Sequence, residues 1–351
     1  MENIYLFILI ALVLLAFADL IVGVSNDAVN FLNSAIGSKV LSFKTLMIIA
    51  SLGVFVGCVY SSGMMEVARK GIFNPGEFLF NEIMIIFMAV MITDILILDL
   101  FNSWGLPTST TVSIVFELLG ASVAMALIKI GVDNGSFTDL ATYINTSKAT
   151  QIILGILLSV FVAFSIGAIV QWVSRLLLSY DFKTKATWVG AIFGGIALTA
   201  ISYFVLMKGI KGTSYAGESF DLIGGVTIKD FLESNVITIV TYSSIICSLI
   251  SFSLIRFFNV DIYKLIIWAG TFALALAFAG NDLVNFIGVP IAAWQSYEAW
   301  VASGVAANEF SMQVLASKVP TPNFLLIIAG IVMVVTPVSY THLRAHETMV
   351  D

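Results

Sequence analysis

Two short polar motifs, one in each half of the chain, contain residue types that bind ions. Each has an Asn-Asp pair with a second asparagine one helical turn later, and each follows a long apolar run: Asn26, Asp27, Asn30, Asn281, Asp282 and Asn285. Polar and ionisable groups at membrane depth are costly and mark ion or substrate pathways. Matching polar motifs in two halves predict a transporter built from internal repeats, with its site where the copies meet. The alternative is that these residues only cap helices at the surface.

A third motif, Gly105 to Thr111, separates two further apolar runs. Pro107 cannot donate a backbone hydrogen bond and disfavours helix at the residue before it, so we expect a break there. A helix that starts near Ser109 would present unpaired N–H groups and a positive dipole end. With the hydroxyls of Ser109, Thr110 and Thr111, this is a predicted anion site. An ordinary Pro-Ser/Thr helix start is the alternative.

The composition indicates the class of protein. The chain has 351 residues, of which 59% are hydrophobic and 11% charged, which is typical of an integral membrane protein. The net charge of −6 argues against a nucleic-acid partner. Both cysteines, Cys58 and Cys247, lie in apolar runs, so no disulfide framework or metal cluster is implied. Both histidines, His342 and His346, lie near the C-terminus, which excludes a histidine-based site in the membrane body.

The apolar runs predict an all-α integral membrane protein. The expected spans are 4–24, 42–62, 83–101, 110–130, 150–174, 187–207, 236–257, 263–279 and 324–338. Residues 31–41 and 283–294 are apolar but too short to cross about 30 Å of hydrocarbon, so they suit broken or re-entrant half-helices. If the spans alternate in direction, the two Asn-Asp motifs follow an odd-numbered and an even-numbered span. They would then be related as an inverted-repeat transporter requires.

Four more acidic residues fall within apolar runs: Asp19, Asp94, Asp99 and Glu117. Asp94 and Asp99 would be separated by about 140° on a helix, so they do not share a face. Glu117 lies about two turns beyond Ser109 on nearly the same face and is placed to add to a cation path. The alternative for each is a residue satisfied by a polar neighbour or exposed at the membrane edge.

The three motifs in this order resemble the inorganic phosphate transporter (PiT) family, over most of residues 1–335. The resemblance implies symport of phosphate with sodium or protons through an inverted-repeat fold. It places the substrate and ion site at the residues that match the motifs: Asn26, Asp27, Asn30, Ser109, Thr110, Thr111, Asn281, Asp282 and Asn285. The chain departs from the family at Val112, where histidine is usual, and at Val24-Ser25, where a small residue and Gly-Ala usually precede the Asn-Asp pair.

A second Ser-Thr-Thr motif is also missing after Asp282. We therefore expect a C-terminally truncated transporter, and a naturally short form is the alternative. The predicted parts are a first repeat with extra helices at 1–208, an exposed connecting loop at 209–235, an incomplete second repeat at 236–337 and a non-native tail at 338–351.

The two aspartates are the predicted coupling groups. An ionised carboxylate repels phosphate at low dielectric, so Asp27 and Asp282 need a sodium ion or a proton beside them. The substrate-binding residues would then be Asn26, Asn30, Ser109, Thr110, Thr111, Asn281 and Asn285. We expect no other cofactor, and as partners we expect inorganic phosphate, a coupling cation and the bilayer.

The resulting prediction is a multi-pass phosphate symporter of the cell inner (plasma) membrane, with a homodimer left open. One alternative is a sulfate permease of the same family, because sulfate is also a tetrahedral dianion. Others are a non-transporting membrane subunit or sensor, and a membrane enzyme that acts on a phosphate-bearing lipid. The enzyme is disfavoured because the body of the chain has no histidine and no nucleophile–base pair.

Overall fold

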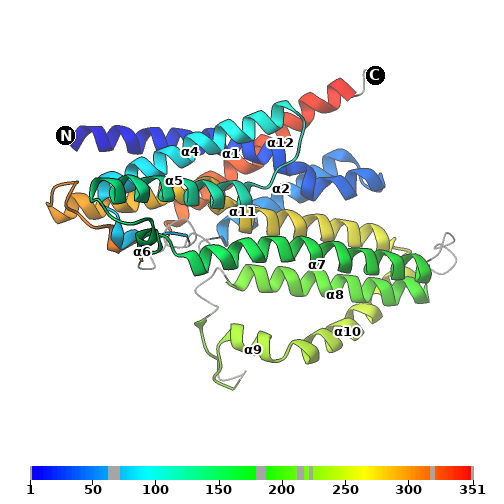
Figure 1. Ribbon diagram of the computed structural model, residues 1–351. Helices are drawn as coiled ribbons and strands as arrows, with labels where there is room; N and C mark the ends of the chain where they lie inside the picture. Colours follow the sequence, from blue (N-terminus) through cyan, green and yellow to red (C-terminus); the bar gives the residue numbers. More distant parts are fainter. Residues whose placement is uncertain are drawn as a thin grey trace. The chain divides into compact units, whose positions relative to one another are not determined.

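The apolar runs fold into long helices, because a chain in hydrocarbon must satisfy its backbone hydrogen bonds internally. A computed structural model describes residues 2–61, 72–178, 187–211, 217–220, 224–316 and 321–348 (Figure 1). The main helices are α1 (Glu2–Ser38), α2 (Phe43–Val59), α4 (Phe80–Ser103), α5 (Thr110–Val132), α7 (Thr146–Leu178), α8 (Trp188–Lys211), α10 (Val236–Phe258), α11 (Ile262–Ser303) and α12 (Asn323–Thr348). Short helices connect them: η2 (Pro75–Glu77), η3 (Phe137–Asp139), α6 (Leu140–Tyr143), α9 (Ile228–Ser234) and η6 (Met312–Ala316).

Each predicted span coincides with one of the main helices. Within the described ranges, 7 helices are long and apolar enough to cross a membrane, by length and composition. The apolar parts of α2 and of α12 are shorter. The prediction of an all-α, multi-pass membrane protein is therefore confirmed.

The helices that carry the Asn-Asp motifs are continuous, and here the prediction of separate half-helices was wrong. Residues 31–38 extend α1, and residues 283–294 lie within α11, which contains Pro290. The motif side chains find partners without a break in the backbone. Asn30 Nδ2 donates to Asp27 Oδ1 at 3.4 Å and Asn285 Nδ2 donates to Asp282 Oδ1 at 3.3 Å within their own helices, and the start of α5 supplies further partners. The helices therefore have no need to open at these residues. The inverted-repeat relation stays a prediction.

The break at Pro107 is confirmed. Helix α4 ends at Ser103, Gly105 has a φ of 67°, and α5 begins at Thr110. A positive φ is easily adopted by glycine, which has no Cβ, and it turns the chain toward the next helix. The turn places the hydroxyl-rich start of α5 at the end of α4.

The chain divides into two compact units. Unit 1 contains Met1–Asn30, Ser61–Ile156 and Ala279–Asp351, and unit 2 contains Phe31–Tyr60 and Leu157–Phe278. One boundary follows α2, and the others fall inside α1, α7 and α11; those in α1 and α11 lie directly beside the two Asn-Asp motifs. The motifs themselves and the start of α5 all belong to unit 1. This division by contacts does not test the predicted division into repeats and tail, which stays a prediction.

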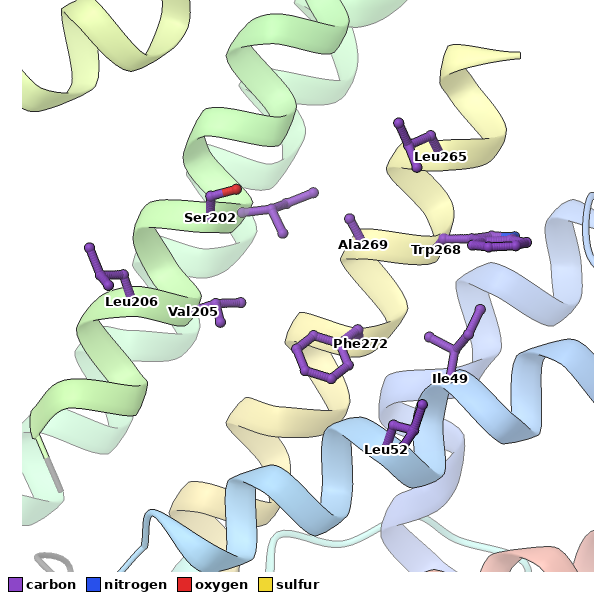
Figure 2. A pocket seen from close by; sticks show the side chains of 10 residues that line it. Ile49, Leu52, Ser202, Val205, Leu206, Leu265, Trp268, Ala269 and Phe272 are labelled. Carbon is purple, nitrogen blue, oxygen red and sulfur yellow. The ribbon is translucent and has the colours of Figure 1, made fainter. Parts of the chain in front are cut away.

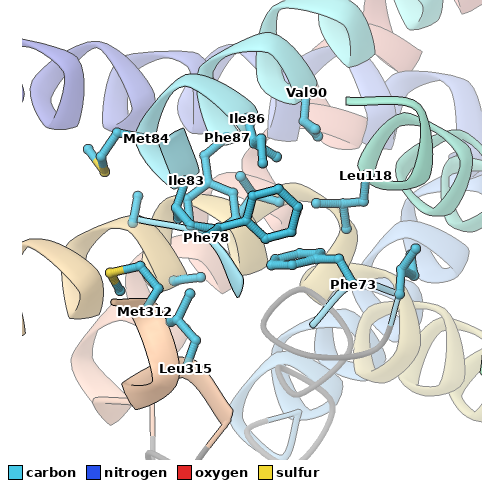
Figure 3. Packing of buried hydrophobic residues seen from close by; sticks show 14 of the residues in the cluster. Phe73, Phe78, Ile83, Met84, Ile86, Phe87, Val90, Leu118, Met312 and Leu315 are labelled. Atoms are coloured by element: carbon cyan, nitrogen blue, oxygen red, sulfur yellow. The ribbon is translucent and has the colours of Figure 1, made fainter. Parts of the chain in front are cut away.

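The core of unit 1 holds α4 and α5 together (Figure 3). Phe78 and Phe87 are fully buried, and Phe73 packs edge-on against Phe78 with ring centroids 5.8 Å apart. At the far end of α5, Lys129 forms an ion pair with Glu82 of α4 at 2.8 Å. These contacts fix α5 along α4, and thereby fix where its N-terminus lies.

Unit 2 contains a close helix pair. Helices α8 and α10 pack together, and a Cβ placed on Gly195 would collide with Ser248. Small residues allow backbones to approach in membranes, where packing and not the hydrophobic effect drives helix association.

Candidate functional site

Asn26 holds the turn between α4 and α5 against α1. Its Nδ2 donates to Asn102 Oδ1 at 2.7 Å and to the carbonyl oxygen of Leu106 at 3.1 Å. Its Oδ1 accepts a hydrogen bond from the backbone N–H of Thr108 at 2.9 Å. The side chain is 7% exposed, so these bonds occupy most of its capacity. Asn26 thus positions the loop that leads into α5, and a direct contact with substrate stays a prediction.

Asn102 also connects the α4–α5 turn to α1, and we call the contacts of Asn26 and Asn102 the clamp. The sequence analysis did not identify Asn102. Its Nδ2 donates to the carbonyl oxygen of Val22 at 2.9 Å, in the turn of α1 that precedes Asn26. Its position offered a signal, because it is a carboxamide at the end of an apolar run, just before Gly105 and Pro107.

Ser109 caps α5. Its Oγ accepts a hydrogen bond from the backbone N–H of Val112 at 3.3 Å, as an N-cap residue does. That bond uses an oxygen lone pair and leaves the hydroxyl proton available for a ligand. Ser109 is exposed, so its proton can reach a molecule in the adjoining cavity.

Thr110 connects the first Asn-Asp motif to the second. Its Oγ1 donates to Asp27 Oδ2 at 3.1 Å and accepts from Asn285 Nδ2 at 3.1 Å. All three side chains are buried, with 2% of Thr110, 3% of Asp27 and 3% of Asn285 exposed. A residue from α5 therefore joins α1 to α11.

Thr111 makes the corresponding connection to the second motif. Its Oγ1 donates to Asp282 Oδ1 at 3.2 Å and accepts from Asn285 Nδ2 at 3.0 Å. Asp27 and Asp282 are close enough for their charges to interact. Two carboxylates in this arrangement repel each other, and a cation beside them would remove the repulsion.

The remaining predicted residues lie around this junction of α1, α5 and α11. Asn281 is half-buried beside Asp282, and Asn30 is exposed one turn after Asp27. The structure thus brings both Asn-Asp motifs and the Ser-Thr-Thr motif together in unit 1. The roles of the individual residues stay predictions.

Gly23 and Phe286 let the two motif helices approach. A Cβ placed on Gly23 would collide with the ring of Phe286, which is fully buried. Gly23 lies one turn before Asp27, and Phe286 lies one turn after Asp282. The glycine is therefore needed for α1 and α11 to meet beside the two aspartates.

A cavity of about 580 Å³ lies against the first turns of α5 in unit 1. Its polar lining includes Thr108, Ser109, Ser113 and Glu117. It is the natural access to the Ser109 hydroxyl, because that side chain lines it.

A second cavity, of about 540 Å³, lies in unit 2 and has a different character (Figure 2). Its lining is apolar except for Ser202, and includes Leu52, Trp268 and Phe272. It offers no charged group and a single hydroxyl, so it does not suit a phosphate anion.

Comparison with known proteins gives a consistent family. The sequence profile of the Phosphate transporter family matches residues 23–341. A protein of Thermococcus kodakarensis named "Putative phosphate permease" is 25% identical over 335 residues, which cover 93% of this chain and 72% of that protein. A protein of Pyrococcus abyssi with the same description is 25% identical over 332 residues, covering 93% and 73%.

A solved structure described as "The sodium-dependent phosphate transporter" has a similar fold. It matches with a TM-score of 0.63 and 19% identity, over 94% of this chain and 74% of that one. At this identity the likeness concerns the fold.

Proposed function

The chain belongs to the phosphate transporter family, and from this premise we propose that it is a sodium-coupled phosphate symporter whose site is the junction of α1, α5 and α11. As a member of this family it is a membrane transporter and not an enzyme. The observation that carries the proposal is that Thr110 and Thr111 connect Asp27 of the first motif with Asp282 and Asn285 of the second.

The start of α5 supplies donors for phosphate. The Ser109 hydroxyl proton is free of the cap bond, and the N-terminal N–H groups of α5 with its dipole favour an anion. The hydroxyl protons of Thr110 and Thr111 are directed at the carboxylates of Asp27 and Asp282. They reach phosphate only if the carboxylates find another partner.

Sodium is that partner in this proposal. Carboxylate and amide oxygens suit hard cations, and Asp27, Asp282 and Asn285 provide them together. A sodium ion on the carboxylate oxygens displaces the hydroxyl protons of Thr110 and Thr111, which can then turn to phosphate oxygens. Phosphate binding thereby depends on sodium binding, as symport requires.

The energetics favour more than one cation per phosphate. Moving a dianion into a cell at an inside-negative potential of 100 mV costs about 4.6 kcal/mol, from about 2.3 kcal/mol per charge. Two sodium ions cancel this cost, and a third makes uptake electrogenic. Asp27 and Asp282 offer one carboxylate for each of the first two ions.

The choice of sodium rests on the likeness in fold to a protein described as sodium-dependent, and on this set of oxygen ligands. A proton as coupling ion is the competing outcome. We further propose that the protein resides in the cell inner (plasma) membrane, and a homodimer stays a prediction.

The test is uptake of radiolabelled phosphate by the purified protein in proteoliposomes. We expect uptake under an inward sodium gradient, its loss with a sodium ionophore, and little effect of a proton gradient alone. Uptake driven equally by a proton gradient without sodium would contradict the sodium assignment. Unlabelled phosphate should compete with the label, and competition by sulfate at equal concentration would instead favour a sulfate permease.

A further inference from the structure

Three acidic side chains outside the phosphate junction meet inside unit 1. Asp19 of α1 and Asp94 of α4 are fully buried, and Glu117 of α5 is half-buried. Asp19 interacts with both Asp94 and Glu117, and Asp94 also interacts with Glu117. The phosphate site as proposed uses none of them.

The positions of the three acids on their helices are related. Asp19 lies eight residues before Asp27, and Glu117 lies eight residues after Ser109. Asp94 lies eight residues before Asn102, which binds Asn26. Eight residues of helix span about 12 Å. Helices α1, α4 and α5 therefore run together from the junction to a second polar site about 12 Å along each helix. Asp94 of this second site still interacts with Asp27 at the junction.

Most carboxyl oxygens of these three acids have no hydrogen-bond donor beside them in the described part of the chain. Neither oxygen of Asp19 or of Asp94 accepts a hydrogen bond, and neither does Oε2 of Glu117. Ser113 lies near Asp94, but its single hydroxyl proton is donated to Glu117 Oε1 at 2.6 Å. Asp19 thus approaches the α4–α5 acids from a third helix with both of its oxygens unpaired. Buried polar groups are normally paired, so three carboxyl groups with unpaired oxygens that meet at one place call for an explanation, and a bound ion or proton is one.

No basic side chain from the surrounding helices compensates these acids. Residues 2–38 of α1 and 80–103 of α4 contain no lysine or arginine, and Lys129 of α5 is paired with Glu82. The apolar part of α12, residues 323–337, carries no charge, and the motif acids of α1 and α11 only add negative charge. An ionised carboxylate buried without a partner is strongly unfavourable.

A proton satisfies this arrangement better than a metal ion. Two carboxyl groups that face each other are both acceptors, and they share one proton because both cannot stay ionised at close range. The junction proposed for sodium adds the Asn285 amide and the threonine hydroxyls to its two carboxylates, whereas the unpaired oxygens of Asp19 and Asp94 face other carboxyl groups.

We propose that Asp19, Asp94 and Glu117 form a proton-binding site, separate from the phosphate junction, in which Asp19 and Asp94 share one proton that exchanges through Glu117. Glu117 is the member of the three that lines the cavity of about 580 Å³. Ser113 lines the same cavity and bonds Glu117, so the hydroxyl and the carboxyl form the route between the cavity and Asp94.

The cavity also connects this site to transport. Ser109, at the start of α5, and Glu117 both line it. Phosphate and a proton would then enter through the same cavity. The proton site would thereby make transport depend on pH, and this coupling rests on the proposed function. The proton site itself does not, because it follows from the three buried acids.

The direct test is infrared difference spectroscopy of the purified full chain. A protonated carboxyl group has a carbonyl stretch that shifts in D2O, and labelling all aspartates with 13C at the carboxyl shifts it again without any substitution. We expect a band at neutral pH that is sensitive to both D2O and the label, in sodium and in choline buffers alike. Its absence in both buffers would overturn the proposal. A band that disappears only when sodium is added would mean that the site holds sodium instead.

Substitutions then assign the band. Asp94→Asn should shift the band, because the buried Asp19 then keeps the proton alone, and the double variant Asp19→Asn, Asp94→Asn should remove it. Asp99→Asn should leave the band unchanged, because Asp99 lies on the same helix as Asp94 but is exposed. Glu117→Gln should keep the band and slow its exchange in D2O. A band that persists unchanged in the folded double variant would contradict the assignment, and the isotope label decides if that variant does not fold.

Phosphate uptake by the same preparations separates the two proposals. If the band is present and phosphate uptake is absent, the proton site stands and the proposed function fails. If uptake is sodium-driven and no band is found, the reverse holds. With both present, Glu117→Gln should lose the dependence of uptake on external pH, and unchanged pH dependence would exclude Glu117 from the route.

Discussion

Replacement of Thr110 by valine tests the link between the two motifs with the smallest change of shape. Valine keeps the branched side chain and removes the hydroxyl that donates to Asp27 and accepts from Asn285. The site is 2% exposed, so water cannot easily replace the lost group. The substitution therefore removes one donor and leaves the backbone of α5 in place.

The expected magnitude follows from which ligand the hydroxyl serves. At saturating sodium, the ion occupies the carboxylate oxygens and the Thr110 proton is free for phosphate. A hydrogen bond to a charged group contributes about 1.5–3 kcal/mol. Since each 1.4 kcal/mol is a factor of about ten, the apparent Michaelis constant for phosphate should rise by about 10- to 150-fold. Sodium affinity should not fall, because sodium no longer competes with the hydroxyl for Asp27.

The assay is sodium-driven phosphate uptake in proteoliposomes, with each ligand varied at saturation of the other. Thr271→Val is the matched control: Thr271 is 3% exposed, and its hydroxyl bonds only the carbonyl oxygen of Ile267 in its own helix, at 2.8 Å. The control should behave as wild type. An unchanged apparent Michaelis constant for phosphate in Thr110→Val would refute the reasoning, and so would a loss of sodium affinity with no change in that constant.

Further substitutions test the other parts of the site. Asp27→Asn and Asp282→Asn should each abolish sodium-driven uptake in proteoliposomes, because each removes a charge that attracts the ion; normal uptake with unchanged sodium dependence would contradict this. Gly23→Leu should prevent α1 from approaching Phe286 and eliminate uptake while the protein still inserts in the membrane, which membrane fractionation can show. Asn26→Leu should lower both uptake and thermal stability, since each buried group left unpaired costs about 1–3 kcal/mol; wild-type melting would show that the clamp on the α4–α5 turn is dispensable.

The sequence predicted the helices well because the bilayer leaves few alternatives. A chain in hydrocarbon must form helices over its apolar runs, and Pro107 must interrupt them. Helical geometry also separated Asp94 from Asp99, and the structure confirms it, with Asp94 buried and Asp99 exposed. These predictions depend only on local chemistry.

Other features depend on how the helices are packed. The continuity of α1 and α11 was not predicted, because a polar motif can be satisfied either by opening a helix or by bonding within it, as Asn285 does with Asp282. The meeting of Asp19, Asp94 and Glu117 depends on the rotation of three helices about their axes. Rotation is set by tertiary packing, which a single sequence does not specify.

The clamp formed by Asn26 shows the same limit for a single residue. Its motif predicted a substrate-binding residue, whereas its hydrogen-bond partners in the structure are Asn102 and the loop 106–108. A carboxamide has equal capacity for a ligand and for backbone, and only the fold determines which partner lies within reach.

The most direct test of the central claim is phosphate binding to the purified protein, measured by titration calorimetry at several sodium concentrations. If sodium on Asp27 and Asp282 releases the threonine donors, phosphate affinity should rise with sodium, and sodium affinity should rise with phosphate by the same factor. The double variant Asp27→Asn, Asp282→Asn should lose this mutual dependence. Equal phosphate affinity in wild type with and without sodium would contradict the account.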